Sequence, residues 1–377
     1  MVYIIDALRL PIGKANGIYK NILPEKLVAF LLKALVLRNN LVPQQISEIV
    51  LANAFGTGGN MARYASLLAG LPDFVSSFTL DAQCSGGLKA VEIGAAIVNY
   101  QNNSLVISGG LESKSLEPKK FYHKNDERSD TTSLQFQVAK FSPNQKSLSP
   151  LLDAASLTAD FFDISKMEMM DWTVKSHKKA ILAKENGALN SYMLSMDQSH
   201  FDQSIKQDLT LEKLYELGSL NKIDFTNSAH YNDGAALVLL ANQKYMEAHS
   251  CPFLAKIIAT SSVGFKPEMA PSAINEAIKA VLNQTNLSCE NIDLFEINES
   301  FAVTPVAFAK EFDVEHNKIN ALGGNLAYGH PFGASGTINL IHLIASLHFY
   351  KKKRGLVAIP AAGGLATAML IEIENVN

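Results

Sequence analysis

The sequence has little cysteine: Cys84, Cys251 and Cys289 are the three among 377 residues. So few thiols exclude the disulfide framework of small secreted domains and suit a reducing compartment. The sequence also lacks a strong charge of one sign, because 33 Lys and Arg residues oppose 36 Asp and Glu residues, for a formal net charge of -3. Without a large positive field we expect neither nucleic acid nor a membrane as a partner.

A secretory signal and long apolar runs are missing as well. Residues 1–6 have the pattern of a short strand and not of a basic region followed by an apolar core. No uninterrupted apolar run is long enough to span a bilayer. We therefore expect a cytoplasmic protein. Hydrophobic residues make up 47% of the chain, which is enough for a large packed core.

Helical and strand-like segments alternate at both ends of the chain. Residues 46–52 and 104–108 have the apolar runs of buried strands, and residues 24–37 have the apolar spacing of a helix. Such alternation indicates an α/β layer fold with much parallel pairing. From about residue 112 to residue 227 the chain is richer in Lys, Asp, Gln and Ser, and its helical segments have no strong strands between them. We predict an inserted, mostly helical subdomain there.

The second half of the sequence repeats the first at an offset of 246 residues. Ungapped matches at this offset pair residues 29–35 with 275–281, Ile46 with Ile292, and Phe55 with Phe301. The same offset pairs Cys84 with His330, and each of these residues lies in a small-residue turn that opens an apolar helix. Several matches with one offset indicate two similar halves about a pseudo-twofold axis. We expect Cys84 and His330 to meet where the halves join.

Cys84 and His330 form a candidate nucleophile–base pair. A thiolate is the nucleophilic form of cysteine, and the positive end of a helix stabilises that anion. Histidine titrates near neutrality, so it can accept the thiol proton. The alternative for Cys84 is an inert buried cysteine at a strand-to-helix corner. The alternative for His330 is a polar side chain satisfied by the backbone.

Asn298 is a third candidate, because it follows an apolar strand at the kind of strand end where ligand sites form in such sheets. Its amide can hold a water molecule or donate to an oxyanion. Alternatively, Asn298 forms a turn and Glu299 caps the next helix. Both interpretations can hold together.

These segments resemble the thiolase family, which forms or cleaves 3-oxoacyl-CoA thioesters through a cysteine-bound acyl group. The matching segments are residues 9–14, 59–63, 67–72, the Cys84 turn, 109–113, 232–236, 298–299 and 329–331. The last of these is highly specific to thiolases, whereas the related ketoacyl synthases use other histidine motifs. The resemblance implies duplicated halves in a layered αβαβα arrangement. The N-terminal half comprises residues 1–118 and 228–247, the inserted loop subdomain residues 119–227, and the C-terminal half residues 248–377.

The resemblance also implies roles for single residues. Cys84 would be the acylated nucleophile and His330 its activator. Asn298, through a held water molecule, and His330 would stabilise the enolate oxygen of the second substrate. The backbone N–H groups of Cys84 and Ala362 would form the oxyanion hole for the acyl thioester.

Acyl-CoA and coenzyme A are the implied substrates, with no permanently bound cofactor and no metal. The inserted subdomain would cover coenzyme A around Lys206 and Ser228. Lys206 falls where relatives often carry an arginine, although a solvated surface lysine fits the sequence equally well. The resemblance further implies a homodimer or a homotetramer.

The chain departs from the family at the position of a second reactive cysteine, which here is Pro360. Proline has neither a thiol nor a backbone N–H, and an acid–base group of this kind contributes about 10²–10⁴-fold in rate. Ala155 and Ser156 also replace a Met-Gly pair, and His230 stands where a small residue is common.

The predicted function is a thiolase-type acyltransferase that works through an acyl group on Cys84. The alternative is a catalytically weakened paralogue, in which Pro360 has replaced the second cysteine. Such a protein would bind acyl-CoA, hydrolyse it slowly or act as a partner subunit.

Overall fold

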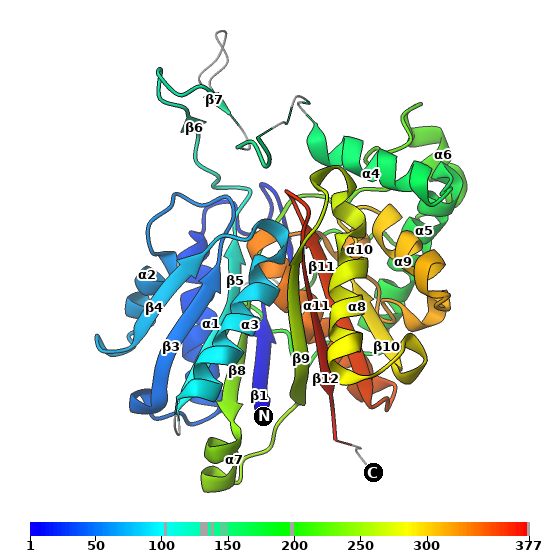
Figure 1. Ribbon diagram of the computed structural model, residues 1–377. Coiled ribbons are helices and arrows are strands. Elements are labelled where there is room, and N and C mark those ends of the chain that lie inside the picture. Colours follow the sequence, from blue (N-terminus) through cyan, green and yellow to red (C-terminus); the bar gives the residue numbers. More distant parts are fainter. Residues whose placement is uncertain are drawn as a thin grey trace.

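One mixed sheet runs through both halves of the chain, in the strand order β10-β11-β12-β9-β1-β8-β5-β3-β4, with β2 paired to β8. Figure 1 shows the computed structural model, which describes residues 1–101, 104–128, 135–136, 139–143, 145, 147, 149–196 and 200–374. The strands of the sheet are β1 (Val2–Arg9), β2 (Gly13–Lys14), β3 (Ile46–Ala52), β4 (Ser76–Leu80), β5 (Leu105–Glu112), β8 (Asn232–Asn242), β9 (Ala255–Gly264), β10 (Leu294–Ile297), β11 (Arg354–Ala361) and β12 (Leu365–Glu372). The predicted parallel pairing occurs at the two outer ends, among β3, β4 and β5 and between β10 and β11. The middle of the sheet is antiparallel.

Two helices lie between the halves of this sheet. They are α3 (Gly86–Tyr100) and α11 (Phe332–Phe349), which pack against each other and contact strands of both halves. Helices α1 (Pro24–Arg38) and α2 (Met61–Leu68) cover the outer face of one half, and α8 (Ala273–Thr285) and α9 (Val303–Phe312) cover that of the other. This confirms the predicted layered α/β arrangement.

Both faces of each half-sheet are buried, and alternate residues of a strand enter different cores. In β3, Ile49 and Leu51 pack under α1 and α2, whereas Val50 and Ala52 face the central helices. In β11, Leu356 packs under α8 and α9. Because a strand covered on both sides has no polar face, these strands are nearly continuous apolar runs in the sequence.

The internal repeat is visible in the structure. Helices α3 and α11 begin at Gly86 and Phe332, which are 246 residues apart, as are the 3-10 helices Pro43–Gln45 and Cys289–Asn291. The strands that follow the central helices, β5 and β11, begin 249 residues apart, because α11 has 18 residues and α3 has 15. The halves join where Val2–Ile4 of β1 pairs with Ala255–Ile257 of β9. The residue boundaries predicted for the two halves remain a prediction.

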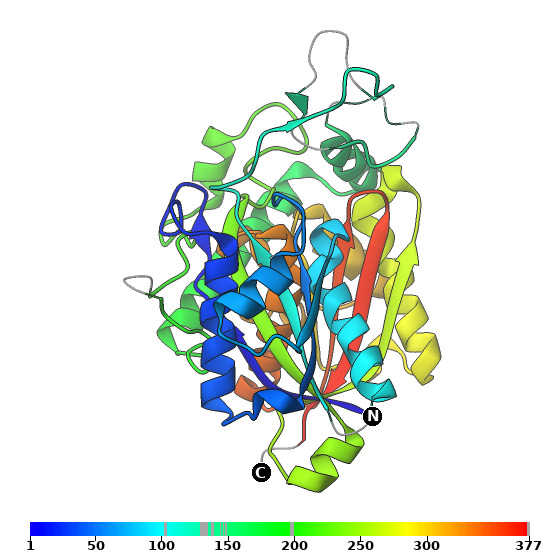
Figure 2. The same ribbon diagram turned by 90° about the vertical axis from the view of Figure 1, so that its left-hand side faces the viewer.

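The inserted segment lies over the end of the sheet at which β5 and β11 finish (Figures 1 and 2). Its elements are β6 (Lys120–Phe121), β7 (Gln135–Phe136), α4 (Pro150–Phe161), α5 (Lys166–Glu185) and α6 (Leu211–Leu217). Helix α5 begins with a capping box, in which Ser165 and Glu168 satisfy each other's backbone N–H. The chain also forms α7 (Gln243–His249) after β8 and the short α10 (Asn325–Tyr328) before α11. Within the described residues, no helix combines the length and apolarity needed to cross a membrane.

The two central helices meet at glycines. A Cβ on Gly336 would lie 2.3 Å from the backbone nitrogen of Leu88, and a Cβ on Gly87 would lie 2.8 Å from the carbonyl oxygen of Gly333. The neighbouring atoms are backbone, which cannot swing aside as the end of a long side chain can. The amino ends of α3 and α11 are therefore in backbone contact.

We predict that Gly336→Ala destabilises the protein by roughly 1–3 kcal/mol, as overpacking of a tight contact typically does. The measurement is urea unfolding followed by circular dichroism. The matched control is Gly264→Ala, because a Cβ on Gly264 meets no atom within 4 Å. Equal stability of the two variants would contradict the packing described for α3 and α11.

Candidate functional site

The candidate catalytic residues come from turns that meet where the two halves join. Cys84 lies in the 3-10 helix Gln83–Ser85, between β4 and α3. Asn298 directly follows β10, and His330 lies two residues before α11. The 3-10 helix of Cys84 packs against both α11 and β11. The tertiary structure thus gathers segments that are more than 200 residues apart in the chain.

Cys84 is buried in the central core with Phe55 and Phe332 as neighbours in the same cluster. Burial, with a smaller contribution from the negative charge of Glu112, raises the pKa of the Cys84 thiol to about 12. The thiol is therefore protonated in the resting protein. Cys84 is also in the first turn of its 3-10 helix, where backbone N–H groups have no intrahelical acceptor.

His330 is buried and neutral, because burial lowers its pKa to about 3. Both ring nitrogens have hydroxyl partners: Nδ1 lies 2.6 Å from Ser335 Oγ, and Nε2 lies 3.1 Å from Ser300 Oγ. The backbone N–H of His330 donates to the His230 carbonyl at 3.0 Å. Among the described residues, the imidazole makes no hydrogen bond to Cys84. The structure brings the two turns together, but their side chains are not joined by a hydrogen bond.

The amide of Asn298 is fully buried and oriented by hydrogen bonds at both ends. Its Oδ1 accepts from the backbone N–H of Ser300 at 3.0 Å and from the Ser300 hydroxyl at 2.5 Å. Its Nδ2 donates to Asn325 Oδ1 at 2.8 Å. The predicted Asn turn is therefore present, and the same amide faces the His330 partner Ser300.

Glu299 collects hydrogen-bond donors and holds this turn in place. The donors to its carboxylate are Trp172 Nε1 at 2.8 Å, Ser176 Oγ at 2.7 Å, Asn320 Nδ2 at 2.7 Å and the Leu326 backbone N–H at 3.1 Å. The alternative that Glu299 caps the next helix is wrong, since α9 has no side-chain cap. Glu299 instead accepts an N–H at the start of α10, because the chain folds α10 back beside the turn.

Glu112 ties the two halves together beside Cys84. Its carboxylate accepts from the backbone N–H groups of Ala54 at 3.0 Å, Phe55 at 3.2 Å and Gly333 at 3.0 Å. Burial raises its pKa to about 7, although the backbone donors act in the opposite direction. Gly333 is in the first turn of α11, so this side chain links the loop after β3 to the helix that follows His330.

The chain at residues 227–231 passes between the Ser300 turn and the His330 turn. Ala302 N–H donates to the Asn227 carbonyl at 2.8 Å, and Ala229 N–H donates to the Ser300 carbonyl at 3.0 Å. On the other side, the His230 carbonyl accepts from His330. Residues 227–231 therefore act as a spacer that sets the separation of the two turns.

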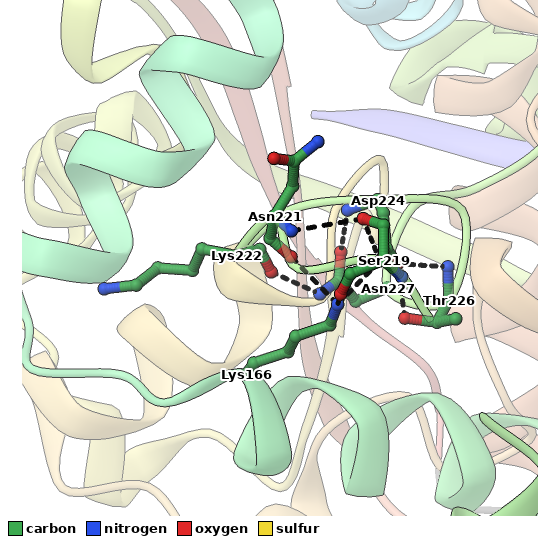
Figure 3. Close-up of polar contacts among 7 residues, drawn as sticks. All are labelled: Lys166, Ser219, Asn221, Lys222, Asp224, Thr226 and Asn227. Atoms are coloured by element: carbon green, nitrogen blue, oxygen red, sulfur yellow. Dashed lines mark hydrogen bonds and ion pairs between the residues drawn. The ribbon is translucent and has the colours of Figure 1, made fainter. Parts of the chain in front are cut away.

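A network of polar contacts anchors this spacer to α5 (Figure 3). Lys166 Nζ donates to Asp224 Oδ2 at 2.6 Å and to the carbonyls of Ser219 at 2.6 Å and Asn221 at 2.8 Å. Burial acts to raise the pKa of Asp224, but the hydrogen bonds from Lys166 and Thr226 outweigh it, and the pKa lies below its ordinary value. The anchor is therefore a charged pair at the pH of most assays.

Of the two residues predicted near coenzyme A, Ser228 is part of this spacer. Lys206 lies near it, because burial and next the positive charge of Lys206 lower the pKa of His230. The Ser228 hydroxyl is buried without a hydrogen-bond partner, and its backbone bridges to Phe301. The Lys206 side chain is exposed, while its backbone N–H donates to His177 Nδ1 at 3.1 Å. Partial burial and the positive charge of Lys14 lower the pKa of Lys206.

Pro360 occupies the end of β11 without breaking the sheet. The carbonyl of Ala358 faces β10, because it accepts from Asn298 N–H at 3.0 Å. Alternate residues of a strand face the same neighbour, so the nitrogen of Pro360 also faces the side of β10. Because β10 ends at Ile297, the partner of Ala358, the missing N–H of Pro360 interrupts no hydrogen bond of this ladder. Ala362 lies buried in the turn that follows, and the 3-10 helix of Cys84 packs against β11 itself.

An aromatic wall of Phe55, Tyr231 and Phe332, which the sequence does not predict, lies beside Cys84. The ring of Phe332 lies 4.6 Å from that of Phe55 and 4.9 Å from that of Tyr231, measured between centroids. Lys114 Nζ lies 5.2 Å from both the Phe55 and the Tyr231 ring centroids. Burial and the proximity of Cys84 raise the pKa of Tyr231. Nothing in the spacing of these residues along the chain indicates that they meet.

Ser300 and Ser335, whose hydroxyls contact the two ring nitrogens of His330, are further candidates that the sequence analysis does not single out. A signal existed for each: Asn-Glu-Ser is a pattern in which a Ser N–H can bond the Asn side chain, and Ser335 lies five residues after His330, near the start of the helix. Among the described residues, no group of three or more His, Cys, Asp and Glu side chains is arranged to hold a metal ion.

Comparisons with known proteins agree along the whole chain. Residues 2–244 match the family described as "Thiolase, N-terminal domain", and residues 251–373 match "Thiolase, C-terminal domain". "Putative acetyl-CoA C-acetyltransferase YhfS" of Bacillus subtilis (strain 168) is 31% identical over 382 residues, which cover 98% of each chain. "Probable acetyl-CoA acyltransferase" of Staphylococcus aureus (strain COL) is 30% identical over 390 residues, again 98% of each. The crystal structure of the Bacillus anthracis acetyl-CoA acetyltransferase superposes with a TM-score of 0.90 at 27% identity, over 98% of each chain.

We predict that Glu299→Gln destabilises the protein by about 1–3 kcal/mol, because an amide NH₂ would face buried donors that then lack an acceptor. The chain has one tryptophan, Trp172, which donates to Glu299, so its fluorescence reports on this site directly. We expect a shifted Trp172 emission in the native variant and a lower urea midpoint.

The matched control for this prediction is Glu311→Gln, which removes a partly exposed ion pair with Lys279. Such a pair contributes less than about 1 kcal/mol. The role given to Glu299 is wrong if both variants unfold at the same urea concentration with unchanged Trp172 emission.

Proposed function

This chain belongs to the thiolase family, and on that premise we propose that it is an acyl-CoA acyltransferase that forms or cleaves 3-oxoacyl-CoA through an acyl group on Cys84. The observation that carries the proposal is the convergence of the Cys84, Asn298 and His330 turns at the junction of the halves. Two relatives, one named as an acetyl-CoA C-acetyltransferase and one as an acetyl-CoA acyltransferase, match 98% of the chain, which supports the same reaction class.

Acylation in this proposal is concerted. A thiol pKa of about 12 and an imidazole pKa of about 3 make a thiolate–imidazolium pair unfavourable before substrate binds. The sulfur of Cys84 therefore attacks the thioester carbonyl while His330 takes the thiol proton. The new S–C bond forms, the bond from carbon to the CoA sulfur breaks, and His330 returns the proton to that sulfur. The backbone N–H groups of Cys84 and Ala362 stabilise the oxyanion.

The carbon–carbon step depends on a second set of groups. The enolate oxygen of the second substrate accepts a hydrogen bond from His330 and one from a group held by Asn298. Removal of the α-proton needs a base, and Pro360 supplies none. Acyl transfer to Cys84 is thus retained, while the carbon–carbon step is slow.

Pro360 also favours a second candidate function. A chain that is acylated but lacks the α-proton base would bind acyl-CoA, hydrolyse the acyl-cysteine slowly or serve as a partner subunit to an active enzyme. The two candidates share Cys84 acylation and differ in carbon–carbon turnover, so a rate measurement separates them.

The same proposal includes the substrates and the assembly. Coenzyme A lies under the inserted segment, near the exposed Lys206 and the unpartnered hydroxyl of Ser228. The acyl group lies against the aromatic wall of Phe55, Tyr231 and Phe332. Acyl-CoA and CoA are substrates and not resident cofactors. The assembly is a homodimer or homotetramer in the cytoplasm.

The first test is covalent labelling of Cys84. Incubation with acetyl-CoA should add one acetyl group to the protein, and peptide mass spectrometry should place it on Cys84. The Cys84→Ala variant should carry no adduct, whereas Cys289→Ala should be labelled as the wild type is. An unlabelled wild-type Cys84 would reject the acyl-cysteine mechanism.

The second test restores the missing base. We expect Pro360→Cys to raise the rate of acetoacetyl-CoA thiolysis by roughly 10²–10⁴-fold, the contribution of a positioned acid–base group. Pro267→Cys places a thiol at an exposed proline and should leave the rate unchanged. Fast thiolysis by the wild type would eliminate the weakened paralogue, and free CoA released without carbon–carbon cleavage would identify hydrolysis.

A further inference from the structure

Ser300 links the two side chains that the thiolase reaction requires. Its hydroxyl lies 2.5 Å from Asn298 Oδ1 and 3.1 Å from His330 Nε2. The resemblance to thiolases implies a water molecule held by Asn298 beside His330. In this chain a side-chain oxygen already lies between the two groups.

The direction of these hydrogen bonds follows from fixed backbone donors. Ser300 N–H donates to Asn298 Oδ1, so the oxygen end of that amide faces Ser300. Glu299 N–H likewise donates to Asn325 Oδ1, which leaves the Asn298 NH₂ group to donate to the same oxygen. An amide oxygen can only accept. The Ser300 hydroxyl must therefore donate its single proton to Asn298.

The proton position on His330 then follows. Since the Ser300 proton points to Asn298, Ser300 Oγ can only accept from His330, and Nε2 must carry the imidazole proton. In a neutral ring Nδ1 is then an acceptor, and the Ser335 hydroxyl at 2.6 Å donates to it. In the opposite tautomer, Nε2 would accept the Ser300 proton. Ser300 Oγ and Asn298 Oδ1 would then lie 2.5 Å apart with no proton between them.

We propose that Ser300 is a positioning residue that holds His330 in the Nε2–H tautomer, so that the resting imidazole is a hydrogen-bond donor and not a base toward Cys84. Ser300 Oγ occupies the acceptor position that the substrate oxygen takes when it binds. The site is thereby prepared for the enolate step. Before His330 can take the thiol proton, the ring must change tautomer: Nε2 gives up its proton, Nδ1 gains one, and the Ser335 hydroxyl turns to accept from Nδ1–H. The Ser300 acceptor at Nε2 opposes that change. The effect on the Cys84 thiol rests on the proposed function, whereas the tautomer of His330 does not depend on it.

The tautomer is measured first. Protein labelled with [¹⁵N]histidine distinguishes a protonated from an unprotonated ring nitrogen, and the His330 signals are those lost in His330→Asn. We expect wild-type His330 to be neutral with the proton on Nε2. A proton on Nδ1 would overturn the proposal, whether or not the protein has thiolase activity.

The consequence is measured by alkylation of Cys84 with iodoacetamide in the absence of substrate, read by peptide mass spectrometry. Ser300→Ala removes the acceptor that holds the proton on Nε2. Proton exchange with water can then give the Nδ1–H tautomer, in which Ser335 accepts from Nδ1 and Nε2 is free to take the thiol proton. We expect Cys84 to react roughly 10- to 100-fold faster in this variant, within the range of a positioned base. Ser300→Thr keeps the hydroxyl and should react at the wild-type rate.

Cys251 and Cys289, both partly exposed, report on folding in the same sample and should react equally in every variant. An unchanged or slower rate at Cys84 in Ser300→Ala, with these two cysteines unchanged, would overturn the proposed hold on His330. Failure of acetyl-CoA to label wild-type Cys84 would instead reject the proposed function and leave the tautomer result standing.

Discussion

The site depends on how closely the amino ends of α3 and α11 approach each other. Glycines at this junction allow backbone to touch backbone, and a Cβ on Gly110 would lie 1.9 Å from the Gly333 carbonyl oxygen. Glu112 completes the contact, because its carboxylate binds N–H groups from both halves. The turn before each helix carries one candidate catalytic residue. The packing distance of two helices therefore sets the distance between a thiol and an imidazole that are far apart in the chain.

Burial of polar groups is the second constraint, and it connects stability with chemistry. A buried carboxylate is costly unless it is hydrogen-bonded, so Glu112 and Glu299 each gather several donors, and these donors come from separate segments. The same burial keeps the Cys84 thiol protonated and the His330 ring neutral. The residues that stabilise the junction thus also set the protonation states from which a reaction must begin.

The candidate groups for acyl transfer are all present in the site, whereas those for the carbon–carbon step are not. The candidate nucleophile Cys84 has its turn and its helix, and the Asn298 amide is oriented at both ends. Pro360 stands where the resemblance to thiolases implies a second cysteine, and its ring is accommodated because β10 has already ended there. Between the two parts, Ser300 bonds Asn298 and contacts His330. These differences are the structural basis of the proposal that acyl transfer is retained while the carbon–carbon step is slow.

The sequence by itself determined the local elements and the duplication. Strand β3 (Ile46–Ala52) agrees with its predicted range, and α3 and α11 begin with the predicted offset, because apolar periodicity, glycines and repeated order are properties of neighbouring residues. It also indicated Cys84, Asn298, His330 and Pro360 as candidate site positions. Only the tertiary structure decided that Glu299 binds α10, that Phe55, Tyr231 and Phe332 form one wall, and that Ser300 and Ser335 bracket the imidazole. These contacts join residues that no regular spacing in the sequence connects. They form because buried helices pack together and buried polar atoms need partners, and both bring distant segments of the chain into contact.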